Sequence, residues 1–275
     1  MRLNKDIATY KEIHQQPNMW IKEYQLILQN KQKIYSFVSK RLLSKDTEII
    51  FTGAGTSAFI GNVLSMILPQ KNFFNFKVIP SSDLITHPHI FFQKEKEIVL
   101  VSFARSGNSP ESMGVVNIAN SLCKKISHII ITCNQNGELA KNANLDNTLL
   151  LILPPETDDK GLAMTSSFST MLLTMLLILN IETIENEFSA IETLSLNAVK
   201  MLNSYEKEIQ NIVEKKFERA VFLGSGELKG IAQECHLKLQ EMTDGKIICK
   251  YDSFLGFRHG PKAVINNKTL LVYLF

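Results

Sequence analysis

Residues 49–55 read Ile-Ile-Phe-Thr-Gly-Ala-Gly, and residues 220–226 read Ala-Val-Phe-Leu-Gly-Ser-Gly. Each stretch is an apolar run that ends in a Gly-x-Gly turn, and each is followed by residues that favour a helix. A strand–turn–helix unit that occurs twice at a long interval indicates a duplicated domain. This repeated unit decides the fold that we expect for the chain.

From the first of these stretches to about residue 180, short runs of Val, Ile and Leu alternate with helical segments. We expect strands at 49–52, 76–80, 97–103, 128–133 and 148–153, with helices at about 57–68, 110–123 and 162–180. Nearly continuous apolar content is typical of strands that are buried on both faces of a parallel sheet. The alternation therefore predicts an α/β fold of doubly wound parallel sheets with flanking helices, in a flavodoxin-like three-layer arrangement.

The repeat also predicts how the chain is divided. We expect an N-terminal helical segment at 1–44 with a break at Pro17, a first domain at 45–182, a connecting helix or helix pair at 183–215, and a second domain at 216–275. After the second turn we expect a helix at 227–242 and strands at 246–250 and 269–275. These are too few strands for a sheet like the first, so we expect the second domain to be incomplete.

Composition excludes several classes of protein. The 275 residues contain 30 Lys and Arg against 27 Asp and Glu, a balance that argues against a dedicated nucleic-acid binder. The four cysteines are far apart and the N-terminus lacks a signal-like apolar stretch, so we expect reduced, buried thiols in a cytoplasmic protein. Residues 161–181 carry no charge, but their many hydroxyl groups favour a buried core helix over a membrane span.

The loop that follows the 97–103 strand has the composition of an anion site. It contains Ser106 and Ser109 ahead of a helix that begins at Pro110, and Arg105 adds positive charge. Hydroxyls, backbone N–H groups and a helix N-terminus suit a phosphate monoester. An ordinary helix-capping loop has the same residue types, so that alternative stays open.

Residues 53–58 also match the loose dinucleotide pattern G-x-G-x-x-G/A. Such a site needs an acid about 20 residues later, at the end of the next strand. Residues 71–73 are Lys-Asn-Phe, and the nearest acid, Asp83, comes later. The missing acid argues against a nucleotide-binding oxidoreductase.

The helix expected at 227–242 has two distinct faces. Glu234, Lys238 and Glu241 share one face because they are spaced at i, i+4 and i+7. The apolar face, which we expect to pack on the sheet, consists of Leu228, Ile231, Cys235, Leu239 and Met242. The polar face is either a solvated Glu–Lys pair or the wall of a cleft in which Lys238 holds one carboxylate ionised and the other moves protons.

His259 precedes Gly260 and Pro261, which define a tight loop, and it is a candidate acid–base group or a structural histidine. The other histidines form no H-E-x-x-H or paired-cysteine pattern, so we expect no metal site. A G-x-S-x-G motif is also absent, which argues against an α/β-hydrolase.

Four stretches together resemble the sugar isomerase (SIS) domain family of phosphosugar enzymes, and most of all its tagatose-6-phosphate ketose/aldose isomerase and galactosamine-6-phosphate deaminase group. They are residues 53–57, 103–112, 162–168 and 256–262, which are spread in order over nearly the whole chain. The resemblance implies two SIS domains. Family members continue past residue 275, which again implies an incomplete second domain.

The resemblance also implies roles for individual residues. It places Glu241 as the base that shuttles a proton between C1 and C2, His259 as a ring-opening group supplied by a neighbouring subunit, and Lys238 beside them. The residues implied to line the phosphate and substrate site are Gly55, Thr56, Ser57, Arg105, Ser106, Ser109 and Glu234. Ala104 departs from the hexosamine synthases, which have serine there.

The function expected from this resemblance is aldose–ketose isomerisation of a sugar phosphate, with or without loss of ammonia, by a homodimer or larger homo-oligomer. We expect neither a metal nor an organic cofactor, because a carbon next to a carbonyl is acidic enough for proton transfer alone. A sugar phosphate is the expected partner, with no nucleic acid and no membrane. The alternative is a non-catalytic phosphosugar-binding regulator.

Overall fold

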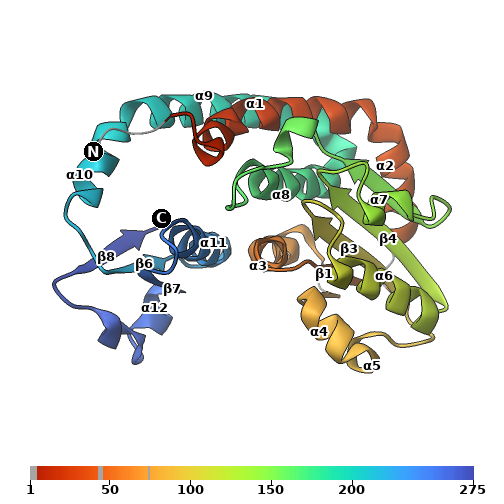
Figure 1. The fold of residues 1–275 in the computed structure, drawn as a ribbon. Coiled ribbons are helices and arrows are strands. Elements are labelled where there is room, and N and C mark those ends of the chain that lie inside the picture. The colour runs from red at the N-terminus through yellow and green to blue at the C-terminus, as the bar shows by residue number, and fades with distance from the viewer. Residues whose placement is uncertain (1–4, 43–45, 74) are drawn as a thin grey trace.

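Two parallel β-sheets organise residues 5–42, 46–73 and 75–275, which the computed structural model describes (Figure 1). The first sheet has the order β2-β1-β3-β4-β5, and the second has the order β7-β6-β8. Every strand pair is parallel. The strands are β1 Glu48–Thr52, β2 Phe76–Val78, β3 Glu97–Ala104, β4 Lys125–Thr132, β5 Thr148–Ile152, β6 Arg219–Leu223, β7 Ile248–Asp252 and β8 Thr269–Tyr273.

Helices flank both sheets, as expected for an α/β fold. They are α1 Ala8–Gln29, α2 Lys31–Phe37, α3 Thr56–Ile67, α4 Ser81–Thr86, α5 Pro88–Phe91, α6 Pro110–Leu122, α7 Glu138–Lys141, α8 Ser166–Leu179, α9 Phe188–Ser204, α10 Glu206–Val213, α11 Glu227–Met242 and α12 Phe254–Phe257. Shorter turns are the π-helix η1 Val38–Leu42 and the 3₁₀-helices η2 Leu68–Lys71, η3 Pro155–Thr157, η4 Ile181–Glu187 and η5 Pro261–Val264.

The two faces of the first sheet belong to separate hydrophobic cores. Phe51 and Val101 point to one face and pack with residues of α1, α3 and α8. Ile50 and Leu100 point to the other face and pack with residues of α4 and α6. Because side chains alternate along a strand, apolar residues at every position are what a sheet covered on both faces requires. The predicted α/β class, with parallel sheets between helices, is confirmed.

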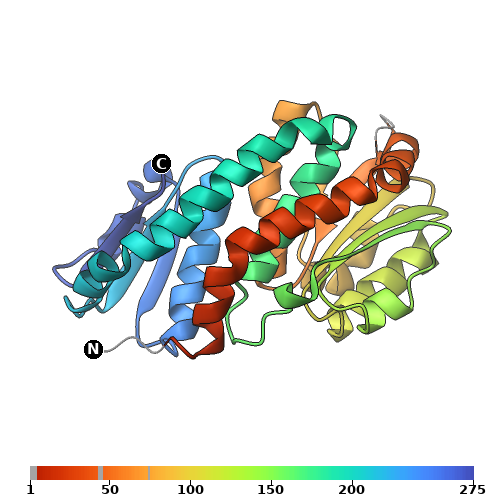
Figure 2. The ribbon, with the colours of Figure 1, turned by 90° about the horizontal axis from the view of Figure 1, so that it is seen from above.

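Helices α1 and α9 lie side by side across both halves of the molecule (Figure 2). The expected break at Pro17 is wrong, because α1 is one continuous helix of 22 residues that contains Pro17. Proline has no N–H with which to bond the carbonyl of Ile13. The side chain of Gln16 replaces that bond, since its Nε2 donates to Ile13 O at 3.2 Å.

Helix α8 is the buried core helix that its hydroxyl-rich sequence predicts. Thr170 and Thr174 are fully buried in it, along with Met171 and Met175. Among the described residues, no single helix is long and apolar enough to cross a membrane, and α8 reaches that length only together with residues 181–204, across a bend of 117°.

Two of the four cysteines are less buried than expected. Cys123 and Cys133 are buried, as predicted, whereas Cys235 and Cys249 are only half-buried. All four are free thiols. Cys235 and Cys249 lie in the second half of the chain, at the core between α11 and its sheet.

Helix α11 packs against two partners, so the expectation that its whole apolar face meets the sheet is wrong. Cys235 and Leu239 do pack against the second sheet. Ile231 packs instead against the core of the first half, and Met242 is 45% exposed. The second partner is α3, which lies beside α11 (Figure 1).

Gly230 permits the close approach of α11 to α3, and Gly230→Ala is therefore expected to lower the free energy of unfolding by about 2 kcal/mol. An added Cβ would lie 2.7 Å from the backbone nitrogen of Val63, which cannot move aside. Urea unfolding measures the change. Gly114→Ala is the control, because its Cβ would meet only the tip of Ile85 at 3.2 Å. Equal stability of Gly230→Ala and the unmodified protein would contradict the tight helix crossing.

The division of the chain into 1–44, 45–182, 183–215 and 216–275, with an incomplete second domain, stays a prediction. The expected boundary between residues 44 and 45 lies outside the described residues. The N-terminal residues 1–4, on which the expectation of no signal peptide rests in part, also lie outside them.

Candidate active site

The serine loop, residues 105–109, joins β3 to α6 at the carboxyl edge of the first sheet. Ser109 is the N-cap of α6: its Oγ accepts a hydrogen bond from Ser112 N at 3.2 Å and lies 2.7 Å from Ser112 Oγ. Ser106 Oγ accepts from Asn108 N at 3.3 Å. The helix-capping interpretation of Ser109 is confirmed, and phosphate binding by these serines stays a prediction.

The loop that follows β4 holds the serine loop in place. Asn134 Nδ2 donates to Ser106 O at 3.0 Å, and Leu139 N donates to Gly107 O at 3.0 Å. Gly107 has a φ of +64°, which favours glycine. No sequence motif indicated Asn134, because an amide that binds a distant backbone carbonyl leaves no local pattern.

The first glycine turn leads into α3 through Gly55, whose φ of +55° again favours glycine. Thr56 Oγ1 donates to Glu234 Oε1 at 3.2 Å, so its hydroxyl is bonded to α11. Ser57 is buried, with its Oγ 4.0 Å from Met164 Sδ. The turn thus connects the first sheet to the polar face of α11.

That polar face is a cluster of Glu234, Lys238 and Glu241. Lys238 Nζ lies 2.6 Å from Glu241 Oε2 and 3.4 Å from Glu234 Oε1. The side chains of Glu234, Lys238 and Glu241 are 8%, 19% and 30% exposed. The alternative of a freely solvated Glu–Lys pair is therefore wrong, and Lys238 bridges two carboxylates in a partly buried setting.

Burial raises the pKa of Glu234 to about 7, although the charge of Lys238 and the hydrogen bond from Thr56 both act to lower it. Its Oε2 is buried and has no hydrogen-bond partner. Glu234 can therefore take up or release a proton near neutral pH, a property that suits acid–base chemistry.

The cluster lies at the same edge as the two loops because α11 runs antiparallel to α3. Gly230 adjoins Val63, Asn62 bonds Gln233, and Thr56 bonds Glu234. Later residues of α11 thus extend past the first residue of α3, at the carboxyl edge of the first sheet. Ligands of open α/β sheets bind at this edge.

His259 lies elsewhere in the chain. It is exposed and follows α12, near the carboxyl end of β7, where Gly224 N bonds Asp252 O. Helix α11 begins at that edge and is 16 residues long, so Glu241 lies roughly 20 Å further along the helix axis. The described chain therefore does not bring His259 to Glu241, and its arrival from a neighbouring subunit stays a prediction.

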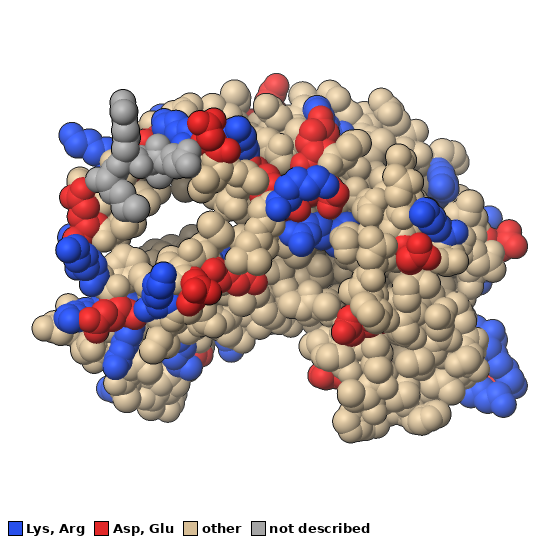
Figure 3. All heavy atoms as spheres, in the orientation of Figure 1, with Lys and Arg blue, Asp and Glu red and all other residues tan. Residues whose placement is uncertain are grey.

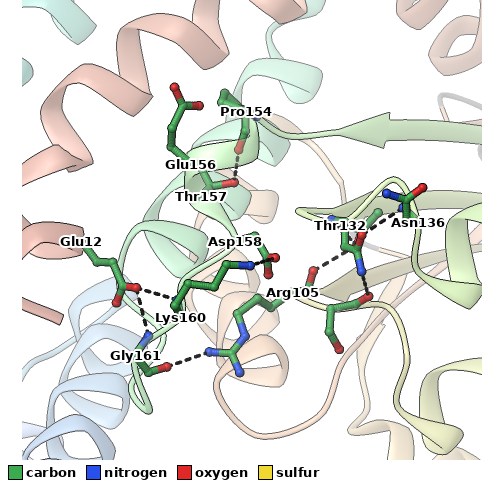
Figure 4. A network of polar contacts seen from close by, with 12 residues as sticks. Glu12, Arg105, Thr132, Asn136, Pro154, Glu156, Thr157, Asp158, Lys160 and Gly161 are labelled. Carbon is green, nitrogen blue, oxygen red and sulfur yellow. Dashed lines mark hydrogen bonds and ion pairs between the residues drawn. The ribbon is translucent and has the colours of Figure 1, made fainter. Parts of the chain in front are cut away.

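Arg105 reaches from the serine loop to a neighbouring loop. Its Nη1 donates to Gly161 O at 3.3 Å, and Gly161 N in turn donates to Glu12 Oε1 at 2.9 Å (Figure 4). Its own carbonyl accepts from Thr132 Oγ1 at 3.3 Å. Arg105 is thus fixed at both its backbone and its side chain.

A cavity of about 640 Å³ adjoins the cluster and is lined by Glu234, Lys238, Met164 and Thr165, together with apolar side chains of α1, α8 and α9. Its lining includes neither the serine loop nor Glu241. Figure 3 shows the molecule hollowed between α9 and α11, with acidic and basic side chains interspersed around the opening. No group of three His, Cys, Asp or Glu that could hold a metal occurs in the described part of the chain.

Comparison with known proteins identifies the family of the chain. The SIS domain family model matches residues 42–181. A protein of Escherichia coli named D-galactosamine-6-phosphate deaminase AgaS is 40% identical over 266 residues, which are 96% of this chain and 69% of that protein.

Solved structures give the same result. A tagatose-6-phosphate ketose/aldose isomerase from Escherichia coli has a TM-score of 0.92 and 38% identity, over 98% of this chain and 73% of that one. A glucosamine-6-phosphate deaminase from Thermotoga maritima has a TM-score of 0.79 and 26% identity, over 97% and 76%. The chain therefore belongs to the SIS domain family, as an enzyme of the group that includes these isomerases and deaminases.

Proposed function

We propose that this enzyme converts galactosamine 6-phosphate and water to tagatose 6-phosphate and ammonia. The observation that carries the proposal is the Glu234–Lys238–Glu241 cluster, partly buried at the edge where the glycine turn and the serine loop also lie. The names of the similar deaminase and isomerase support the choice of substrate.

Binding begins at the phosphate. The hydroxyls of Ser106 and Ser109, the backbone N–H groups at the start of α6 and the guanidinium of Arg105 surround the anion. Ser57, at the start of α3, completes the site from the other loop. Anchoring the phosphate leaves the other end of the sugar free to reach the cluster on α11.

Proton transfer then occurs at that end. After the ring opens, Glu241 removes the proton from C2, and the electrons form an enolamine between C1 and C2. Return of a proton to C1 gives a ketose imine, whose hydrolysis releases ammonia. Lys238 holds the carboxylate of Glu241 at 2.6 Å, and Glu234 exchanges protons near neutral pH.

Ring opening requires a proton donor near O5, which we assign to His259. His259 lies near the edge at which α11 begins, whereas Glu241 lies near the end of α11. The assignment therefore requires a second copy of the chain to supply the histidine. We therefore propose a homodimer or larger homo-oligomer that acts in the cytoplasm.

A thermal-shift panel of hexose and hexosamine 6-phosphates tests the function, with ammonia measured for each ligand that binds. We expect galactosamine 6-phosphate to raise the melting temperature and to release ammonia, and free galactosamine to do neither. Binding of phosphosugars without turnover of any would favour the regulator. Enhanced fluorescence of a reduced nicotinamide on mixing would favour the oxidoreductase.

A further inference from the structure

Glu12 is a buried glutamate near the start of α1 whose carboxylate accepts hydrogen bonds from two backbone N–H groups. It is 7% exposed. Its Oε1 accepts hydrogen bonds from Lys160 N at 2.5 Å and from Gly161 N at 2.9 Å. Its Oε2 is buried without a hydrogen-bond partner. Burial of a carboxyl group is costly unless it is bonded, so these two N–H donors account for its place in the fold.

Gly161 connects Glu12 to the serine loop. Its N–H faces Glu12, and its carbonyl accepts from Arg105 Nη1 at 3.3 Å (Figure 4). An added Cβ at this position would lie 2.7 Å from Glu12 Oε2 and would also collide with Thr9 Oγ1. A larger residue at position 161 would therefore displace the side chains of Thr9 and Glu12.

The chain just before Gly161 is also fixed, through the side chain of Asp159. Asp159 is 4% exposed and accepts from Thr165 N at 2.8 Å, from Ser167 N at 2.9 Å and from Ser167 Oγ at 2.5 Å. Residues 158–161, which we call the strap, are therefore fixed to α8 by Asp159 and to α1 by Glu12. The strap in turn fixes the direction of the Arg105 guanidinium.

We propose that Glu12 is a positioning residue for phosphate recognition, acting through Gly161 on Arg105. The inference rests on the proposed function. A guanidinium has five N–H donors and the bond to Gly161 O uses one of them, which leaves four to bind a phosphate held by the serine loop. Because an arginine held in place loses less side-chain entropy on binding, loss of Glu12 weakens binding. The reacting carbons lie at the other end of the sugar, so turnover at saturation is retained.

A double-mutant cycle tests this chain of contacts, with KM and kcat measured on galactosamine 6-phosphate. Glu12→Ala is expected to raise KM about 10-fold and to change kcat less than about 2-fold. Arg105→Ala is expected to raise KM at least as much, and the double variant no further than Arg105→Ala alone. Effects on KM that multiply in the double variant, or a fall in kcat with KM unchanged, would overturn the proposal.

Two further variants separate positioning from general damage to α1. Glu12→Gln keeps an acceptor oxygen for both N–H donors, so its KM is expected to stay within about 3-fold of the unmodified enzyme. Glu23→Ala is the matched control for Glu12→Ala: Glu23 is a second buried glutamate of α1 but bonds Thr174 in α8, away from the strap. An equal rise of KM in Glu23→Ala and Glu12→Ala would contradict a specific role.

Calorimetric titration with inorganic phosphate distinguishes this inference from the proposed function. We expect Glu12→Ala to bind phosphate about 10-fold more weakly than the unmodified protein. If that difference is found but no sugar phosphate is turned over, the proposed function fails and the role of Glu12 holds. If galactosamine 6-phosphate is turned over but KM and phosphate affinity are unchanged in Glu12→Ala, the role of Glu12 fails and the function holds.

Discussion

Glutamine in place of Glu241 is expected to lower kcat on galactosamine 6-phosphate by about 10²–10⁴-fold, the usual contribution of a positioned acid–base group. The amide has nearly the same size as the carboxylate but cannot accept the C2 proton. KM is expected to change little, because the phosphate contacts lie on the serine loop. Initial rates of ammonia release over a range of substrate concentrations measure both constants.

Glu227→Gln is the matched control for this prediction. Glu227 lies in the first turn of the same helix, α11, and is exposed at the end away from the cluster. Its replacement is expected to leave both constants unchanged. A Glu241→Gln enzyme that retains the kcat of the Glu227→Gln enzyme would show that Glu241 is not the base.

Glu23→Gln is expected to stabilise the protein, and to do so more at pH 8 than at pH 5. Glu23 is fully buried between α1 and α8, where Thr174 Oγ1 donates to its Oε1 at 2.8 Å and its Oε2 has no hydrogen-bond partner. Burial raises its pKa to about 8. The folded protein therefore keeps the carboxyl protonated at pH values where the unfolded chain has released that proton.

This difference makes stability depend on pH with a definite sign. Below the unfolded pKa of about 4.5, the folded and unfolded states both hold the proton, so Glu23 does not make the free energy of unfolding depend on pH. From there to about pH 8 the unfolded state is ionised, so the free energy of unfolding falls by about 1.4 kcal/mol per pH unit from this group. Above the folded pKa the loss is complete.

Urea unfolding at pH 5, 6, 7 and 8 measures the effect as the difference between Glu23→Gln and the unmodified protein. The advantage of the variant is expected to grow at each step, because glutamine does not ionise. Glu192→Gln on α9, at an exposed position, is expected to follow the unmodified protein at every pH. An advantage of Glu23→Gln that is the same at pH 5 and pH 8 would contradict a buried, protonated Glu23.

Much of the fold could be predicted because local sequence dictates it. The apolar run before the second Gly-x-Gly turn indicated the strand β6, and the period of the following residues predicted a helix at 227–242, the observed bounds of α11. The break expected at Pro17 failed because the Gln16 side chain supplies a substitute bond. The apolar face of α11 was assigned to one partner because sequence spacing cannot show that Gly230 admits a second helix.

The site could be predicted only in part for the same reason. Spacing along a helix placed Glu234, Lys238 and Glu241 on one face, but it could not show their burial, which depends on α3. Glu12 binds a backbone amide 148 residues away, and a carboxylate–amide contact of that kind has no sequence pattern. The following Gly260 and Pro261 indicated His259 as a candidate acid–base group, but its distance from Glu241 follows only from the direction of α11.

Incorporation of solvent deuterium tests the proton shuttle at Glu241 most directly. Galactosamine 6-phosphate is incubated with the enzyme in D₂O, and C1 of the product and C2 of the remaining substrate are followed by NMR. We expect deuterium to enter these positions with the unmodified enzyme and not with Glu241→Gln. Equal incorporation by both proteins would contradict the shuttle, as would the absence of both exchange and turnover in the unmodified enzyme with every hexosamine 6-phosphate.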